Sequence, residues 1–147
     1  MFFKYRIFGL IANITLLLNL SLLIGILTLF EATLTLPGIA GIILTVGMAV
    51  DANVLIFERI KEECLHEKNN IIAFDTGYIK SRTAIIDANI TTLISAIILF
   101  FMGSGPIKGF SVTLAVGIFT TLFSVYFIAR LLTGLYVIKN KEKTNLI

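Results

Sequence analysis

An acidic side chain stands inside an apolar stretch of this sequence. Residues 47–63 read GMAVDANVLIFERIKEE, so Asp51 lies among side chains hydrophobic enough to cross a bilayer. Placing a charge there costs roughly 2.5–3.5 kcal/mol on insertion scales. A carboxylate in low-dielectric surroundings can take up and release a proton near neutral pH. We therefore predict that Asp51 carries protons; the alternative is a buried acid that a partner neutralises and whose role is purely structural.

The triplet Asp-Ala-Asn occurs twice, once at Asp51 and once at Asp87. The two apolar runs that hold these acids should cross the membrane in opposite directions, and each acid lies a few residues from a charged end. The two carboxylates are therefore expected at a similar depth, in the inner half of the bilayer. We predict a proton relay of Asp51 and Asp87, with Asn53, Asn89 and Thr91 as its polar neighbours. Spacing alone leaves open whether the two acids face each other.

Other kinds of chemistry find no support in the sequence. Cys64 is the single cysteine and His66 the single histidine, so we expect neither a disulfide within the chain nor a metal site. No nucleophile stands beside a general base, and the turn Gly103–Pro106 lacks the Lys-Ser/Thr pair of a phosphate-binding loop. We expect a transport component and not an enzyme. Its energy source would be a proton gradient, with sodium as the alternative coupling ion, and no bound cofactor is expected.

The composition places these residues in a membrane protein. Hydrophobic residues make up 57% of the 147-residue chain, against roughly 45–50% in soluble domains. Four continuously apolar runs can cross a bilayer as helices, at about 8–30, 36–57, 84–102 and 110–132. The predicted fold is an all-α integral membrane domain of four transmembrane helices, with residues 1–147 forming one unit.

Small residues recur along two of these runs at helical spacing. Such a stripe includes Gly38 and Gly41 in the second run and Gly109 and Gly117 in the fourth. Gly47 of the second run lies off the stripe, on the face that holds the acidic residue. Helices in lipid approach one another closely where their side chains are small. We predict that these glycines form helix-packing surfaces. Gly47 should also leave room for water or a partner group beside the acidic side chain of its own run.

Basic residues are distributed unevenly between the ends of the four runs. All twelve except Lys108 fall in the N-terminal segment, in the connection after the second run or in the C-terminal part. The positive-inside rule therefore predicts that both termini and this long connection lie in the cytoplasm. The net charge of +3 therefore comes from basic residues at helix ends, where they orient the protein in the membrane. No nucleic-acid partner is expected.

The long connection, residues 58–83, is less apolar than the runs on either side. We predict a cytoplasmic loop, which could contain a short helix on the membrane surface. The buried face of that helix would be formed by Ile71, Phe74, Tyr78 and Ile79. Gly77 weakens the prediction of a helix there.

The acidic motif and its surroundings resemble a known family. GMAVDANVLIFERIKEE is preceded by ATLTLPGIAGI and followed by DANITTLISAIILFFMGSGPIKGFSVTLAVGI. Together they are similar to the C-terminal membrane portion of the SecD type in the SecD/SecF family of bacterial protein-export subunits. The resemblance runs from about Tyr5 to Leu132. It implies that the four helices are the last four of a six-helix half of the resistance–nodulation–division (RND) type.

The resemblance implies a multi-pass protein of the bacterial inner membrane that uses the proton-motive force, through Asp51, to assist protein export. The implied partners are SecF, the SecYEG channel, membrane lipids and the secreted polypeptide as substrate. The family's large exported domain has no counterpart here, so we expect a fragment. Two alternatives stay open. One is an RND-type transporter of lipid or small hydrophobic molecules, and the other is an inactive truncated subunit that only packs against partner helices.

Overall fold

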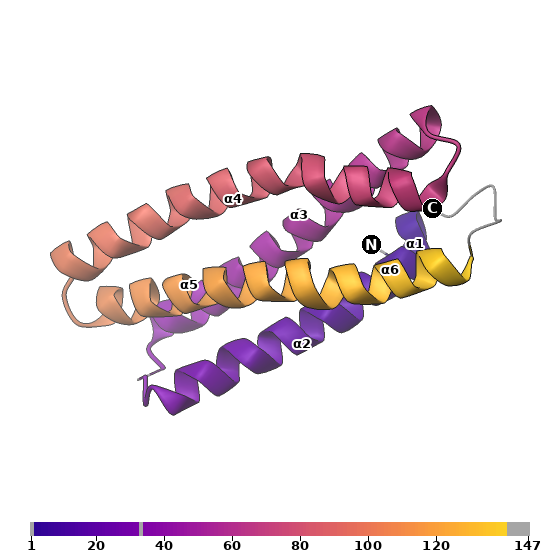
Figure 1. The fold of residues 1–147 in the computed structure, drawn as a ribbon. Coiled ribbons are helices and arrows are strands. Elements are labelled where there is room, and N and C mark those ends of the chain that lie inside the picture. Colours follow the sequence, from indigo (N-terminus) through magenta and orange to yellow (C-terminus); the bar gives the residue numbers. More distant parts are fainter. Residues whose placement is uncertain (1, 33, 141–147) are drawn as a thin grey trace.

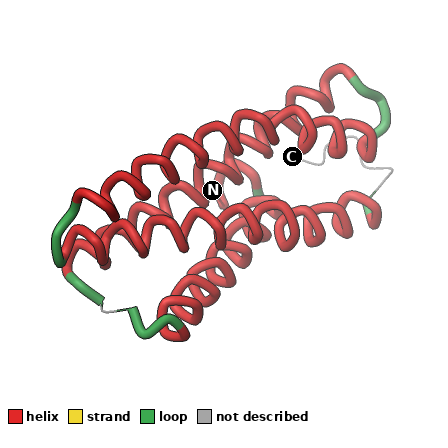
Figure 2. The backbone as a smooth tube through the Cα atoms, turned by 60° about the vertical axis from the view of Figure 1, so that its left-hand side comes forward, coloured by secondary structure: helices red, strands yellow, loops and turns green. Residues whose placement is uncertain are grey.

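The chain folds into long helices joined by short turns (Figures 1 and 2). This computed structural model describes residues 2–32 and 34–140. In chain order the elements are α1 (Phe2–Tyr5), α2 (Ile7–Leu29), α3 (Leu36–His66), α4 (Asn70–Met102), α5 (Pro106–Phe123), the π-helix η1 (Ser124–Ala129) and α6 (Arg130–Lys139). Every regular element in this described part is a helix, and the prediction of an all-α fold is confirmed.

Four rods make up the bundle. The elements α5, η1 and α6 are continuous and act as one rod. Among the described residues, this rod and the helices α2, α3 and α4 are long and apolar enough to cross a membrane. The helix α3 and the rod that contains α5 contact each other, and both also contact α2 and α4 (Figure 1).

Local sequence signals set where these helices begin. Thr35 precedes α3, and its side-chain oxygen accepts a hydrogen bond from the Gly38 amide at 3.1 Å. Asn69 plays the same part before α4, accepting from the Ile71 amide at 3.0 Å. These side chains satisfy amides that have no partner within the helix. The α5 rod starts with Pro106, whose missing amide proton costs nothing in a first turn.

The connection between the second and third spans differs from the expected loop. Residues 58–66 continue α3, and residues 70–83 are the first part of α4, so only a short turn at 67–69 separates the two helices. The expected surface helix is therefore part of a long hairpin of α3 and α4. An ion pair closes the hairpin, with Lys80 Nζ 2.8 Å from an oxygen of Glu63, which is itself buried.

Gly77 explains why the hairpin stays helical. A Cβ atom at this position would lie 2.7 Å from Cγ1 of Ile60 and 2.8 Å from its Cα. The glycine therefore lets the backbones of α3 and α4 approach closely, and this packing outweighs its low helix propensity. A glycine that we interpreted as a helix-weakening residue serves as a contact point.

The two stripes of small residues pack against each other. A Cβ at Gly41 would lie 3.2 Å from two carbons of Thr113, and a Cβ at Gly117 would lie 2.6 Å from Thr45 Cγ2. Gly38 and Gly109 lie near the same interface, where Thr35 contacts both. Gly47 is different, since a Cβ there would meet nothing within 4 Å. Four of the five predicted packing glycines thus lie at a close helix contact, whereas Gly47 lies on an open face.

The bundle has one basic end. Figure 1 shows α1, the end of α6 and the α3–α4 turn at one end, and the α2–α3 and α4–α5 connections at the other. Lys108 lies at the second end, and the remaining basic residues of the described part lie in the half nearer the first, which we call the basic end. Lys141 and Lys143 lie outside the described residues. The cytoplasmic position of the basic end stays a prediction from the positive-inside rule.

Candidate functional site

A groove between α3 and α4 contains parts of both Asp-Ala-Asn motifs. Its volume is about 200 Å³. The lining residues are Met48, Asp51, Ala52 and Leu55 of α3 and Ala84, Ile85, Ala88, Asn89 and Thr92 of α4. Most of this lining is apolar, and the polar groups come from one acid, one amide and one hydroxyl. The predicted acid and one of its predicted neighbours therefore border the same space.

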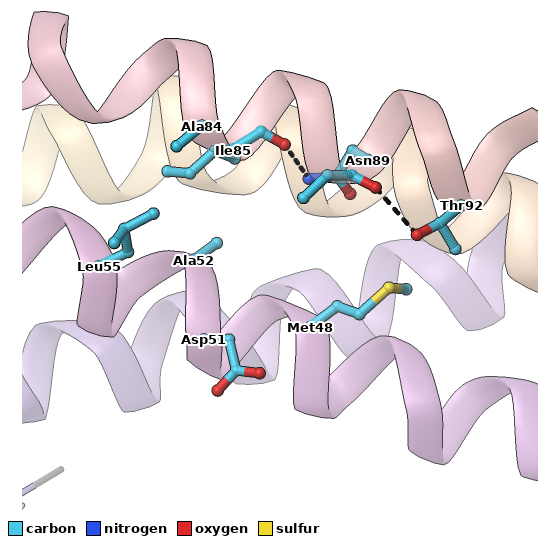
Figure 3. A pocket seen from close by; sticks show the side chains of 9 residues that line it. Met48, Asp51, Ala52, Leu55, Ala84, Ile85, Asn89 and Thr92 are labelled. Carbon is cyan, nitrogen blue, oxygen red and sulfur yellow. Dashed lines mark hydrogen bonds between the residues drawn. The ribbon is translucent and has the colours of Figure 1, made fainter.

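The Asp51 carboxylate does not point across this groove. Figure 3 shows it extending from α3 away from Asn89 and Thr92. The side chain is exposed at the surface of the bundle, and within the described part of the chain it forms no ion pair. A charge on this face would contact lipid unless water or another protein covers it, which is unfavourable at the depth of the hydrocarbon core.

Asp87 lies at the same level but on another face. Gly77 packs against Ile60, so the antiparallel register of α3 and α4 can be counted from this contact. Asp51 lies nine residues before Ile60 on α3. The residue nine positions after Gly77 on α4 is Ile86, so Ile86 and its neighbour Asp87 lie at the level of Asp51. The side chain of Asp87 is also exposed, and it does not line the groove. The two acids are level with each other, yet this groove does not bring them together.

The predicted polar neighbours separate into different environments. Asn89 is buried, and its Nδ2 donates to the Ile85 carbonyl at 2.7 Å, while its Oδ1 has no hydrogen-bond partner in the described residues. Asn53 makes the equivalent bond to the Ala49 carbonyl at 2.9 Å. It belongs to the buried face of α3, whereas Asp51 is exposed. Asn53 is therefore part of the bundle interior and does not line the groove.

Thr91 also lies apart from the groove. Its hydroxyl donates to the Asp87 carbonyl at 2.9 Å on an exposed face. The next residue, Thr92, lines the groove in its place, donating to the Ala88 carbonyl at 3.0 Å. Sequence reasoning missed Thr92, although its position three residues after Asn89, on the same helical face, was the available signal.

A second polar contact joins α2 to the α5 rod inside the bundle. Asn19 Nδ2 donates to Thr121 Oγ1 at 3.2 Å, and both residues are buried. Because both side chains lie inside the bundle, this hydrogen bond is best understood as a contact that joins two helices. In the described part, no group of three or more His, Cys, Asp or Glu side chains has the arrangement of a metal site.

Comparison with known proteins shows which family the chain belongs to. Residues 1–139 match the family described as "Protein export membrane protein SecD/SecF, C-terminal". The chain belongs to this family. It is 51% identical over 138 residues to protein translocase subunit SecD of Magnetococcus marinus, covering 94% of this chain and 26% of that protein. It is 55% identical over 141 residues to SecD of Rhodothermus marinus, covering 96% and 23%.

Solved structures of the SecD/SecF family share the fold. The structure matches the translocon-associated SecDF of Thermus thermophilus with a TM-score of 0.92 and 41% identity, covering 97% of this chain and 20% of that one. It matches SecDF in its super-membrane-facing form with a TM-score of 0.87 and 42% identity, covering 92% and 18%. The chain is thus a multi-pass protein of the inner membrane. It spans about a quarter of the length of the curated SecD relatives it matches.

Proposed function

We propose that this chain is the membrane part of an auxiliary subunit of the protein translocase, in which protonation of Asp51 couples the proton-motive force to protein export. The family and the identity to SecD proteins support the assignment to the translocase. By the same likeness, the proposed partners are SecF and the SecYEG channel, and the secreted polypeptide is the substrate of the assembled complex. The component is a transport protein and not an enzyme.

One observation carries the proton role. Asp51 lies within an apolar span, exposed and without an ion pair among the described residues. Acids at membrane depth almost always face a bundle interior or a water-filled cavity. The exposed face of α3 therefore fits an interface where another membrane subunit, together with water, would surround the carboxylate. Such an enclosed acid can alternate between a charged and a neutral state.

The energy available at this position is sufficient for coupling. Moving one elementary charge through the membrane field is worth about 2.3 kcal/mol per 100 mV. A bias of that size shifts a conformational equilibrium more than tenfold. A cycle in which Asp51 takes a proton from one side and releases it to the other could therefore drive a repeated change in how the rods pack.

The substitution Asp51→Asn tests the role of this carboxylate. The side chain keeps its size but cannot titrate, so we expect gradient-dependent export by the assembled translocase to fall at least tenfold, with the variant still copurifying with its partners. Glu62→Gln is the matched control, because Glu62 is an exposed acid beyond the apolar part of the same helix. Unchanged export by Asp51→Asn would refute the proton role and favour a subunit that only packs against other helices.

The coupling ion is tested in the same assay. We propose the proton, so export should persist in sodium-free buffer and should collapse when a protonophore is added. Export that requires sodium and survives the protonophore would overturn this part of the proposal. Asp87→Asn decides whether the second acid takes part, and a loss comparable to that of Asp51→Asn is expected if both belong to one relay.

A further inference from the structure

A second groove opens on the surface of the bundle between α4 and the α5–η1–α6 rod. Its volume is about 380 Å³. The lining residues are Tyr78, Ile79, Arg82 and Ile86 of α4 and Leu122, Tyr126, Phe127 and Arg130 of the rod. It lies in the half of the bundle nearer the basic end, and several of its residues are exposed, including Arg82 and Phe127. Neither predicted acid lines this groove.

The two arginines of this groove have different partners. Arg130 forms an ion pair with Asp75 at 2.8 Å, and its guanidinium lies 5.8 Å from the centre of the Tyr78 ring. Arg82 forms no ion pair within the described residues; its backbone carbonyl accepts a hydrogen bond from the Tyr126 hydroxyl at 3.3 Å. The groove and its bordering acid therefore carry one uncompensated positive charge, on Arg82.

Polarity changes along the groove in one direction. The bond from Tyr126 to Arg82 places these residues at one level, and Arg130 lies one turn nearer the basic end. Ile86 and Leu122 lie one turn on the other side of that level, toward the middle of the bilayer. The groove is therefore charged where the membrane interface should be and apolar where acyl chains should be.

The backbone is unusual along this groove. Tyr126 and Phe127 belong to the π-helix η1, which interrupts an otherwise continuous α-helical rod. Turns of this kind occur mostly as single insertions and frequently mark functional sites. Here the widened turn presents two adjacent aromatic side chains to the same groove. Aromatic rings are also typical of the interfacial region of membranes.

We propose that this groove binds an anionic phospholipid of the inner leaflet, with Arg82 holding the phosphodiester and an acyl chain lying over Ile86, Leu122 and Phe127. A guanidinium can donate two parallel hydrogen bonds to a phosphate. Basic pockets between membrane helices on the cytoplasmic side bind such head groups. The single free charge matches a head group with one negative charge and no cation, such as phosphatidylglycerol.

Native mass spectrometry of the purified chain in detergent tests this assignment. With added phosphatidylglycerol we expect bound lipid at least fivefold above that seen with phosphatidylcholine or phosphatidylethanolamine. Arg82→Gln should reduce the phosphatidylglycerol adduct to the level of the other lipids. Arg82→Lys keeps the charge but cannot donate two parallel hydrogen bonds, so the amount of its adduct should be intermediate. Lys61→Gln is the control, because Lys61 is an exposed cation near the same end of the bundle.

Three results would overturn the proposal. The first is equal binding of all three lipids. The second is unchanged binding of phosphatidylglycerol by an Arg82→Gln variant whose circular dichroism shows normal helical content. The third is displacement of the lipid by inorganic phosphate. Ile86→Trp checks the acyl-chain part, and it should weaken binding although the charge is kept. A photoreactive residue at Ile79, used in whole membranes, should give an adduct of lipid mass, and an adduct of protein mass would assign the groove to a partner subunit.

Discussion

At the scale of single residues, the missing side chain of a glycine has opposite meanings at two positions of the bundle. At Gly117, an added Cβ would lie 2.6 Å from Cγ2 and 2.9 Å from Cβ of Thr45 on α3. At Gly47, an added Cβ would meet nothing within 4 Å. Gly117 therefore sets how closely α3 and the α5 rod approach, whereas Gly47 affects only its own helix and the surroundings of Asp51.

Replacing these two glycines by alanine should have different effects on the stability of the bundle. Gly117→Ala should lower the free energy of unfolding by about 1–3 kcal/mol, because the new methyl group overpacks a contact that neither helix can easily widen. Gly47→Ala should leave stability unchanged or raise it slightly, since alanine favours the helix. Unfolding in detergent mixtures, followed by circular dichroism, measures both. A Gly117→Ala variant as stable as the parent chain would contradict the close packing.

At the scale of elements, one buried acid beyond the apolar spans joins the two arms of the α3–α4 hairpin. Glu63 is 6% exposed and accepts hydrogen bonds from Lys80 Nζ at 2.8 and 3.0 Å. Arg59 Nε lies 3.4 Å from the same carboxylate. Because removing one partner leaves the other charges without compensation, this ion cluster should contribute to the helicity of both arms.

Glu63→Gln should therefore loosen the hairpin locally. We expect amide hydrogen exchange in residues 58–66 and 70–80 to become several times faster, with little change in the apolar parts of the four rods. Glu62→Gln is the control, since Glu62 is exposed and pairs only with Arg59 one turn away in the described structure. Equal exchange in the two variants would show that the ion pair to Lys80 does not hold the arms together.

At the scale of the whole molecule, the charge distribution divides the bundle into two unlike ends. The end that holds the α2–α3 and α4–α5 connections carries one basic residue, Lys108 in the first turn of α5, and the opposite half carries the rest of those described. Such a bias orients membrane proteins with the basic end in the cytoplasm. The bound lipid proposed above depends on the same orientation, because its head group would lie in the inner leaflet.

The single cysteine makes the orientation easy to test. Cys64 lies near the α3–α4 turn and is free and half-buried. In spheroplasts, a membrane-impermeant maleimide should modify it only after permeabilisation. In a Cys64→Ser background, Ser104→Cys in the α4–α5 connection should react without permeabilisation. The reverse pattern would invert the predicted topology of the chain.

Much of this architecture follows from the sequence because the composition of a long segment is enough to specify a membrane helix. Apolar length predicts the four rods, and the stripes containing Gly41 and Gly117 indicate which faces approach. The hairpin at residues 58–83 was not predicted, because propensity treats Gly77 as unfavourable and cannot show that Ile60 lies against it. Two further features also depend on contacts between distant parts of the chain. They are the outward direction of the Asp51 side chain and the hydrogen bond from Tyr126 to the Arg82 carbonyl.

The lengths of α3 and α4 have a mechanical consequence. With 31 and 33 residues at about 1.5 Å each, both helices are roughly 46–50 Å long, well beyond the ~30 Å thickness of the hydrocarbon core. The hairpin therefore reaches beyond the hydrocarbon core on the side of its tip at residues 67–69. A rigid tilt of the two helices by about 5° would move this tip, which lies roughly 24 Å along the helix from Asp51, by about 2 Å.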